Sequence, residues 1–250
     1  MIVPGAGNAL TARVIADRQF EAVYVTGAGI ANTHLGTPDI GLVTLTELAA
    51  TVSTIAEICQ LPLVVDIDTG FGNSINTRRT VRLIERAGGF AMQIEDQVFP
   101  KKCGHFSGKA VIPVEEALSK IKAAVDARED ENTMIIARTD ARAIDGIEAA
   151  LDRAEAFIEA GADMTFVEAP RSEAEMEMIT KRLSVPQVAN MVVGGKTPLT
   201  PQARLVELGF SLILYANTPL QAAMRAMTDV LSALKLDGDV SSVIDRLADF

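Results

Sequence analysis

The sequence contains no tryptophan, and aromatic residues make up only 4% of its 250 residues. Cysteine is equally scarce: Cys59 and Cys103 are the only two, too few for a disulfide framework, so a reducing compartment is expected. No apolar run approaches the ~20 residues that a membrane helix needs. The N-terminus also lacks the basic and apolar regions of a signal peptide. We therefore expect a cytoplasmic protein that does not interact with membranes.

The sequence also has fewer basic than acidic residues. The 23 Lys and Arg residues are outnumbered by 33 Asp and Glu residues, which gives a formal net charge of −10 and an isoelectric point near 4.8. This balance disfavours binding to nucleic acid or to anionic lipid. It does not exclude a small anionic substrate, because a few basic groups suffice to line a cleft. Hydrophobic residues make up 48% of the chain, enough for a large core.

The hydrophobic pattern alternates between two periods along the whole chain. Short β-rich runs are each followed by a segment with apolar residues at helical spacing, such as "TELAATVSTIAEIC". The runs are nearly continuously apolar, as in parallel sheets covered by helices. Eight such units predict a single (β/α)₈ barrel domain over residues 1–250, with a helical C-terminal segment from about residue 218. An open, doubly wound sheet is the alternative. The expected strands cover residues 1–5, 22–27, 61–68, 90–96, 133–140, 163–169, 186–192 and 211–217.

Polar residues stand at the ends of these expected strands. In a (β/α)₈ barrel the C-terminal ends of the strands form the active site, so these side chains are expected to converge on one mouth. An alternative is that they only cap the following helices. Glu95, Arg138 and Glu168 fit that alternative poorly, because they lie inside apolar runs and buried charges need partners or a ligand.

Three of these residues are candidate metal ligands. Asp66 and Asp68 are two residues apart and therefore project to the same side of a strand. Glu95 comes from the next strand. Carboxylates without neighbouring His or Cys favour a hard cation, Mg²⁺ or Mn²⁺. The alternative is a simple turn, which "DIDTGFG" would also favour.

Cys103 is the candidate catalytic thiol. It lies in "PKKCGH", directly after the fourth strand, whereas Cys59 lies among apolar residues and is expected in the core. Lys101 and His105 would favour its thiolate or hold the thiol ready as a proton donor. Gly104 and Gly108 suit a mobile lid over the mouth.

Taken in order, these segments resemble the isocitrate lyase / phosphoenolpyruvate mutase superfamily. The resemblance extends along nearly the whole chain, and "KKCGH" is similar to the lyase branch rather than to the phosphonate mutases. It departs at Gln93, where some members have His, and at Val193, where many have Glu. The motifs that carry it are "YVTGAG", "LGTPDIG", "VDIDTGFG", "IEDQVFPKKCGH", "ARTDAR", "FVEAP" and "ANMVVGGKTP".

The resemblance implies a Mg²⁺-dependent carbon–carbon lyase that cleaves a 2-hydroxy di- or tricarboxylate, such as a 2,3-dimethylmalate- or 2-methylisocitrate-like acid, to an α-oxo acid and a carboxylic acid. Cys103 would protonate the enolate left by cleavage, with Lys101, His105 and Arg138 as the other catalytic residues. Asp66, Asp68 and Glu95 would hold the metal ion. The substrate-binding residues would be Tyr24, Thr26, Gly27, Ala28, Asp39, Gly104, Arg138, Glu168 and Asn190.

The resemblance also implies a homo-oligomer, a dimer of dimers in which the C-terminal helix is exchanged between subunits. Three other activities stay open. Oxaloacetate hydrolysis or decarboxylation is the main alternative. Phosphonate isomerisation is disfavoured by "KKCGH", and a barrel without catalytic activity is disfavoured by the complete set of carboxylates and thiol.

Overall fold

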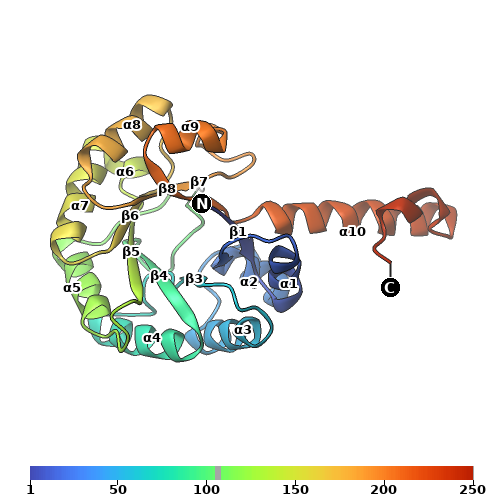
Figure 1. Cartoon of the computed structure of the whole chain (residues 1–250), viewed down its shortest axis with the longest axis horizontal. Helices are drawn as coiled ribbons and strands as arrows, with labels where there is room; N and C mark the ends of the chain where they lie inside the picture. Colours follow the sequence, from blue (N-terminus) through green and yellow to red (C-terminus); the bar gives the residue numbers. More distant parts are fainter. Residues whose placement is uncertain (105–107, 250) are drawn as a thin grey trace.

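Eight parallel strands close into a barrel in the order in which they occur along the chain, in a computed structural model that describes residues 1–104 and 108–249. Each expected strand is present, and the predicted (β/α)₈ barrel is confirmed (Figure 1). Six of the strands are shorter than expected; β2 (Val23–Val25), for example, ends before Thr26, which caps the next helix. Their bounds are β1 Ile2–Ala6, β2 Val23–Val25, β3 Leu63–Asp66, β4 Gly89–Glu95, β5 Met134–Thr139, β6 Met164–Val167, β7 Gln187–Asn190 and β8 Phe210–Tyr215.

Helices surround the barrel, and local sequence fixes several of their ends. Thr44 and Glu47 form a reciprocal capping box at the start of α3, and Asn73 and Asn76 do the same for α4. Gly161 follows α7 with a positive φ, the conformation that glycine adopts most readily. The helices are α1 Ala9–Asp17, α2 Gly27–Ile30, α3 Leu45–Ile58, α4 Ser74–Arg86, α5 Val114–Val125, α6 Arg142–Asp145, α7 Ile147–Glu159, α8 Glu173–Arg182, α9 Gln202–Glu207 and α10 Thr218–Asp237, with a π-helix at Ala31–Leu35 and a 3₁₀ helix at Ser241–Arg246.

Apolar side chains fill both the barrel and the layer between strands and helices. One cluster, which includes Val64, Ile136 and Phe166, draws on all eight strands or the residues beside them and fills the barrel. The layer outside it includes Leu48 and Ile55 of α3. Because the interior is filled, the barrel is not a channel, and a ligand has access only at its rim.

The register of the strands places charged groups side by side at that rim. Asp66 of β3 pairs with Gln93 of β4, and Glu95 of β4 pairs with Arg138 of β5. Neighbouring strands lie about 4.8 Å apart, so these side chains are within reach of one another. The register thus brings carboxylates and a guanidinium to one side of the mouth.

Helix α10 leaves the barrel and extends away from it (Figure 1). No residue of this helix is buried within the chain. Large apolar side chains, among them Met224, Met227 and Leu231, are exposed along it. Among the described residues, no helix is both long and apolar enough to span a membrane.

Candidate active site

The segment after β2 forms one wall of the mouth. Thr26 caps α2, and its Oγ1 accepts a hydrogen bond of 3.2 Å from the backbone N–H of Gly29. A Cβ atom on Gly27 would lie 3.2 Å from Oδ1 of Asp68 and 3.4 Å from Oδ2 of Asp66. The structure therefore brings the predicted substrate-binding segment against the predicted metal ligands.

The three predicted metal ligands are buried carboxylates. Asp66, Asp68 and Glu95 are 7%, 8% and 3% exposed. Burial raises the pKa of Asp68 to about 7, although Lys101 lowers it. Burial also raises the pKa of Glu95 well above its usual range, although Arg138 lowers it. The positive charge supplied by the protein does not fully compensate these carboxylates.

This chemistry fits a divalent cation with oxygen ligands. Oε1 of Glu95 is buried and accepts no hydrogen bond from any residue that the structure describes. Within residues 1–104 and 108–249, however, no three His, Cys, Asp or Glu side chains are already arranged to hold a metal ion. Asp66, Asp68 and Glu95 as metal ligands therefore stay a prediction, supported by an all-oxygen donor set with an unused acceptor.

Lys101 lies between two carboxylates. Its Nζ is 2.5 Å from Oδ1 of Asp39 and 2.6 Å from Oδ1 of Asp68, and its side chain is 3% exposed. Burial lowers the pKa of Lys101, but Asp68 and Asp39 outweigh this effect and raise it well above its usual range. Lys101 is thus a permanent cation at the carboxylate cluster. The structure pairs its ammonium group with Asp39 and Asp68, and the effect of Lys101 on the Cys103 thiol stays a prediction.

Arg138 is held in the centre of the site by three carboxylates. Its guanidinium lies 3.2 Å from Glu95, 3.0 Å from Asp140 and 3.4 Å from Glu168. It also lies over the ring of Phe166, 5.3 Å from the ring centre. Such a restrained guanidinium is preorganised for a planar, bidentate partner such as a substrate carboxylate.

Gly104, which follows Cys103, lies over this arginine. The Cys103 N–H donates to the carbonyl of Asp39 at 3.2 Å. A Cβ atom on Gly104 would lie 2.4 Å from Nη2 of Arg138 and 2.7 Å from Glu168, so a larger residue would not fit. The structure therefore brings Gly104, the neighbour of Cys103, against Arg138 and Glu168, while the role of the Cys103 thiol stays a prediction.

Two further predicted site residues are Asn190 and His105. Asn190 donates to Glu168 at 3.4 Å, which places it in the same cluster. His105 lies outside the described residues, as does the centre of the predicted lid.

Gln93, expected near the pocket but without an assigned role, takes part in the site. It is buried, and its Oε1 accepts a hydrogen bond of 2.7 Å from the Tyr24 hydroxyl. Its Nε2 donates to Oδ1 of Asp66 at 3.2 Å. Burial and Asp66 raise the pKa of Tyr24, so the phenol stays a neutral donor. The signal in the sequence is a lone amide within "FAMQIED", at a position where the chain departs from the family.

Asp140, expected only as a polar residue at the mouth, and Lys109 also belong to the site. Asp140 binds the Arg138 guanidinium through both carboxylate oxygens, at 3.0 and 3.2 Å. The Lys109 ammonium group, in turn, forms an ion pair with Asp140. Asp140 ended an expected strand beside Arg138 and was a detectable candidate. No local pattern marks Lys109 in the sequence.

The fold and the site together define a barrel enzyme with a carboxylate-rich site at the C-terminal ends of its strands. The chain belongs to the phosphoenolpyruvate phosphomutase family, whose profile matches residues 1–235. It is 47% identical over 250 residues to the 2,3-dimethylmalate lyase of Eubacterium barkeri, covering 100% of this chain and 86% of that one. It is 44% identical over 247 residues to the 2-methylisocitrate lyase of Aeropyrum pernix, covering 99% and 79%.

Solved structures give the same result. An oxaloacetate acetylhydrolase in complex with 3,3-difluorooxalacetate superposes with a TM-score of 0.95 at 32% identity, over 99% of this chain and 84% of that one. A phosphonopyruvate hydrolase complex with oxalate and Mg²⁺ superposes with a TM-score of 0.88 at 29% identity, over 100% and 87%. The predicted superfamily is confirmed, and the relatives named as lyases support the predicted carbon–carbon lyase.

Proposed function

We propose that this protein is a Mg²⁺-dependent lyase that cleaves an alkyl-substituted, malate-type acid to an α-oxo acid and a carboxylic acid. The observation that carries the proposal is the position of Cys103. Its neighbour Gly104 lies against Arg138 and Glu168, next to a cluster of buried carboxylates. A thiol beside a carboxylate-binding arginine is where an enolate intermediate would need a proton.

Two parts of the mouth would bind the substrate: Arg138 and the segment from Thr26 to Ala28. Arg138 would bind one carboxylate of the substrate, exchanging part of its present ion pairing for the new partner. The segment from Thr26 to Ala28 would bind the part of the substrate that becomes the α-oxo acid, since it borders Asp66 and Asp68. Cys103 would then donate its proton to a substrate held between the two segments.

The reaction itself needs two proton transfers. The 2-hydroxyl group gives its proton to a carboxylate of the site, which acts as the general base. The electron pair of the O–H bond then forms the carbonyl of the α-oxo acid, and the pair of the broken C–C bond remains on the other product as an enolate. The Cys103 thiol protonates the enolate carbon and becomes a thiolate.

A divalent cation would be held by Asp66, Asp68 and Glu95, directly or through water. When bound, it would supply positive charge to the developing alkoxide and carbonyl oxygen. The oxygen-only donor set and the unused Oε1 of Glu95 favour this assignment. The complex of a phosphonopyruvate hydrolase with oxalate and Mg²⁺ agrees with it.

The preferred substrate is assigned from sequence. Val193 stands where many family members carry Glu, which would make the far end of the site apolar rather than charged. Burial of a substrate methyl group stabilises the complex by about 0.8 kcal/mol, whereas burial of a polar group without a hydrogen-bond partner costs free energy. The 47% identity to a 2,3-dimethylmalate lyase favours the same class of substrate.

A comparison of four substrates tests the proposal. The enzyme with Mg²⁺ is incubated separately with 2,3-dimethylmalate, 2-methylisocitrate, isocitrate and oxaloacetate, and the products are identified by NMR. We expect the highest kcat/KM for 2,3-dimethylmalate, with pyruvate as a product. The second candidate is oxaloacetate hydrolysis, which is favoured by the oxaloacetate acetylhydrolase structure at a TM-score of 0.95. Oxalate and acetate as the only products would establish that activity instead.

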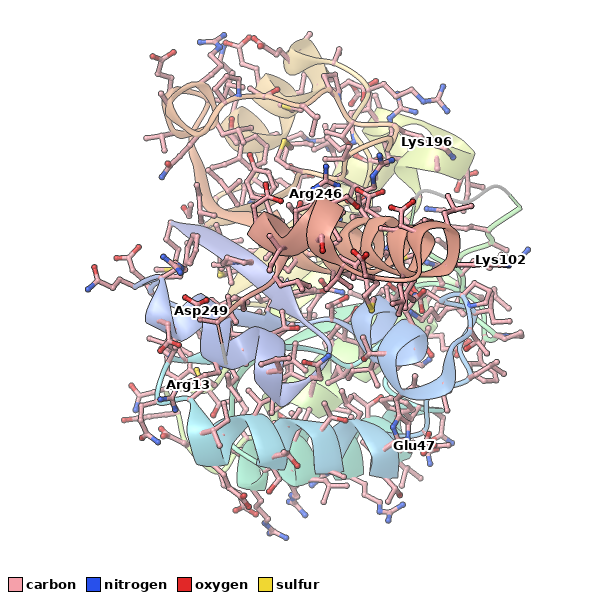
Figure 2. The ribbon with its side chains drawn as sticks, turned by 90° about the vertical axis from the view of Figure 1, so that its right-hand side faces the viewer. Arg13, Glu47, Lys102, Lys196, Arg246 and Asp249 are labelled. Atoms are coloured by element: carbon pink, nitrogen blue, oxygen red, sulfur yellow. The ribbon has the colours of Figure 1, made fainter. Side chains whose placement is uncertain are left out.

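We also propose that the protein is a homo-oligomer in which α10 packs on a second copy. An isolated helix with several exposed apolar side chains is unfavourable in water. Leu220, Met224, Met227, Leu231 and Leu234 recur at intervals of three and four residues, so they share one face of α10. In Figure 2, α10 is seen from its far end and projects from the surface of the molecule. Light scattering at micromolar concentration would detect the oligomer, and a monomer would refute the proposal.

A further inference from the structure

Lys109 carries a buried charge that the reaction described above does not use. Its side chain is only 2% exposed. The Nζ group donates to the carbonyl oxygen of Gly104 at 2.5 Å and also to a carboxylate oxygen of Asp140. Gly104 is the neighbour of Cys103, so this ammonium group joins the backbone beside the thiol to the rim of the barrel.

The Asp140 end of this connection is fixed. Asp140 is fully buried and receives both hydrogen bonds from the Arg138 guanidinium. Its backbone N–H donates to Asp96 at 2.9 Å, which holds the main chain in place as well. Burial raises the pKa of Asp140, but Arg138 and Lys109 outweigh this effect and lower it, so the carboxylate stays charged. The Lys109 ammonium group therefore connects the carbonyl oxygen of Gly104 to a fixed carboxylate, that of Asp140.

The other side of the thiol is attached independently. The Cys103 N–H donates to the carbonyl of Asp39 at 3.2 Å. The main chain at Cys103 and Gly104 is thus held at two points, by Asp39 before the thiol and by Lys109 after it. Without Lys109, the second of these two points is lost.

We propose that Lys109 is a positioning residue that fixes Gly104 over Arg138 and thereby positions the adjacent Cys103. The inference rests on the proposed function, in which Cys103 donates the proton. Lys109 acts through its link between the Gly104 carbonyl and Asp140 and does not contact the reacting atoms. Because misplacement of a catalytic group by about 1 Å can cost roughly 10²-fold in rate, loss of this link lowers kcat more than it weakens substrate binding.

The test variant is Lys109→Met, which removes the ammonium group but keeps much of the side-chain volume. Lys102→Met is the matched control. It removes a lysine of the same loop, whose Nζ donates to the carbonyl of Gly108 at 3.0 Å but which is exposed at the surface (Figure 2). Lys109→Arg keeps the charge and tests for partial rescue.

Two measurements are made on each variant: steady-state kinetics with Mg²⁺, and the rate at which iodoacetamide alkylates Cys103, located by peptide mass mapping. Cys59 is buried and serves as an internal reference. We expect Lys109→Met to lose about 10²-fold in kcat with KM changed less than about 3-fold. Its Cys103 should react several-fold faster than in the wild-type protein. Lys102→Met should match the wild type in both assays, and Lys109→Arg should lie between.

Three outcomes would overturn the proposal. They are a wild-type kcat in Lys109→Met, a reduced kcat with unchanged thiol reactivity, or equal effects in Lys102→Met. If Lys109→Met does not fold, Lys109→Gln replaces it, with the same two changes expected and wild-type values in both assays counting against the proposal. Alkylation does not depend on catalysis, so it tests Lys109 separately from the proposed function. That function fails on its own if Cys103→Ala keeps the wild-type kcat.

Discussion

The substitution Asp68→Asn gives the sharpest test of the charge balance at the site. Burial raises the pKa of Asp68 from 3.8 to about 7 in the metal-free protein. A charged Asp68 is therefore less favourable in the folded state than in the unfolded state. Asparagine has the same shape and lacks the charge, so we expect it to stabilise the metal-free protein while it abolishes activity.

The size of this effect follows from the pKa difference. One pKa unit corresponds to about 1.4 kcal/mol, so a rise from 3.8 to about 7 amounts to about 4 kcal/mol at most. The sign also follows. Because the folded-state pKa is the higher one, the folded protein binds more protons between these two pH values, and its stability falls as the pH rises through them. The advantage of Asp68→Asn is thus absent near pH 4 and fully present above about pH 7.

Urea unfolding in the presence of EDTA measures this difference. At pH 8, Asp68→Asn should unfold with a free energy up to about 4 kcal/mol higher than the wild type, and at pH 4 the two should agree. Mg²⁺ should stabilise the wild type at pH 8 but not the variant. Asp17→Asn, which removes an exposed carboxylate paired with Arg13, should change stability by less than about 0.5 kcal/mol. A less stable Asp68→Asn at pH 8 would refute the reasoning.

Three further predictions concern catalysis and metal binding. Cys103→Ala should lose about 10²–10⁴-fold in kcat but still bind product in a calorimetric titration, and a variant within a few-fold of wild type would mean that another group donates the proton. Chelation should abolish activity and added Mg²⁺ or Mn²⁺ should restore it, so full turnover in excess chelator would contradict the metal assignment. Gln93→Leu removes the amide between Tyr24 and Asp66 and should weaken Mg²⁺ binding by about 10–100-fold; an unchanged Kd by calorimetry would count against this role.

The fold could be predicted because its determinants are local. Continuous apolar runs, helical periodicity and turn residues such as Gly161 each act over a few positions, and together they specified eight strand–helix units. The position of the polar residues at the rim could be predicted from the same pattern, because the C-terminal ends of all eight strands lie on one side of the barrel. Asp66, Glu95, Arg138 and Glu168 were found in this way.

The partners of the charged groups were harder to predict, because they depend on contacts between distant segments. Lys101 stands two residues before Cys103, which suggested an effect on the thiol, yet its ammonium group binds Asp39, 62 positions away in the sequence. Lys109 binds Asp140, 31 positions away. Neither pairing leaves a signal in the spacing of the sequence. Strand register and loop path determine both, and these become known only from the folded chain.

The central claim is that this enzyme breaks a carbon–carbon bond and that Cys103 protonates the resulting enolate. Cleavage of 2,3-dimethylmalate in D₂O with Mg²⁺ tests both parts, because the thiol exchanges its proton with solvent. NMR should show pyruvate together with propionate that carries one deuterium at C2. Cys103→Ala should form both products at a rate lower by about 10²-fold or more. The absence of pyruvate, with oxalate and acetate formed from oxaloacetate instead, would contradict the account.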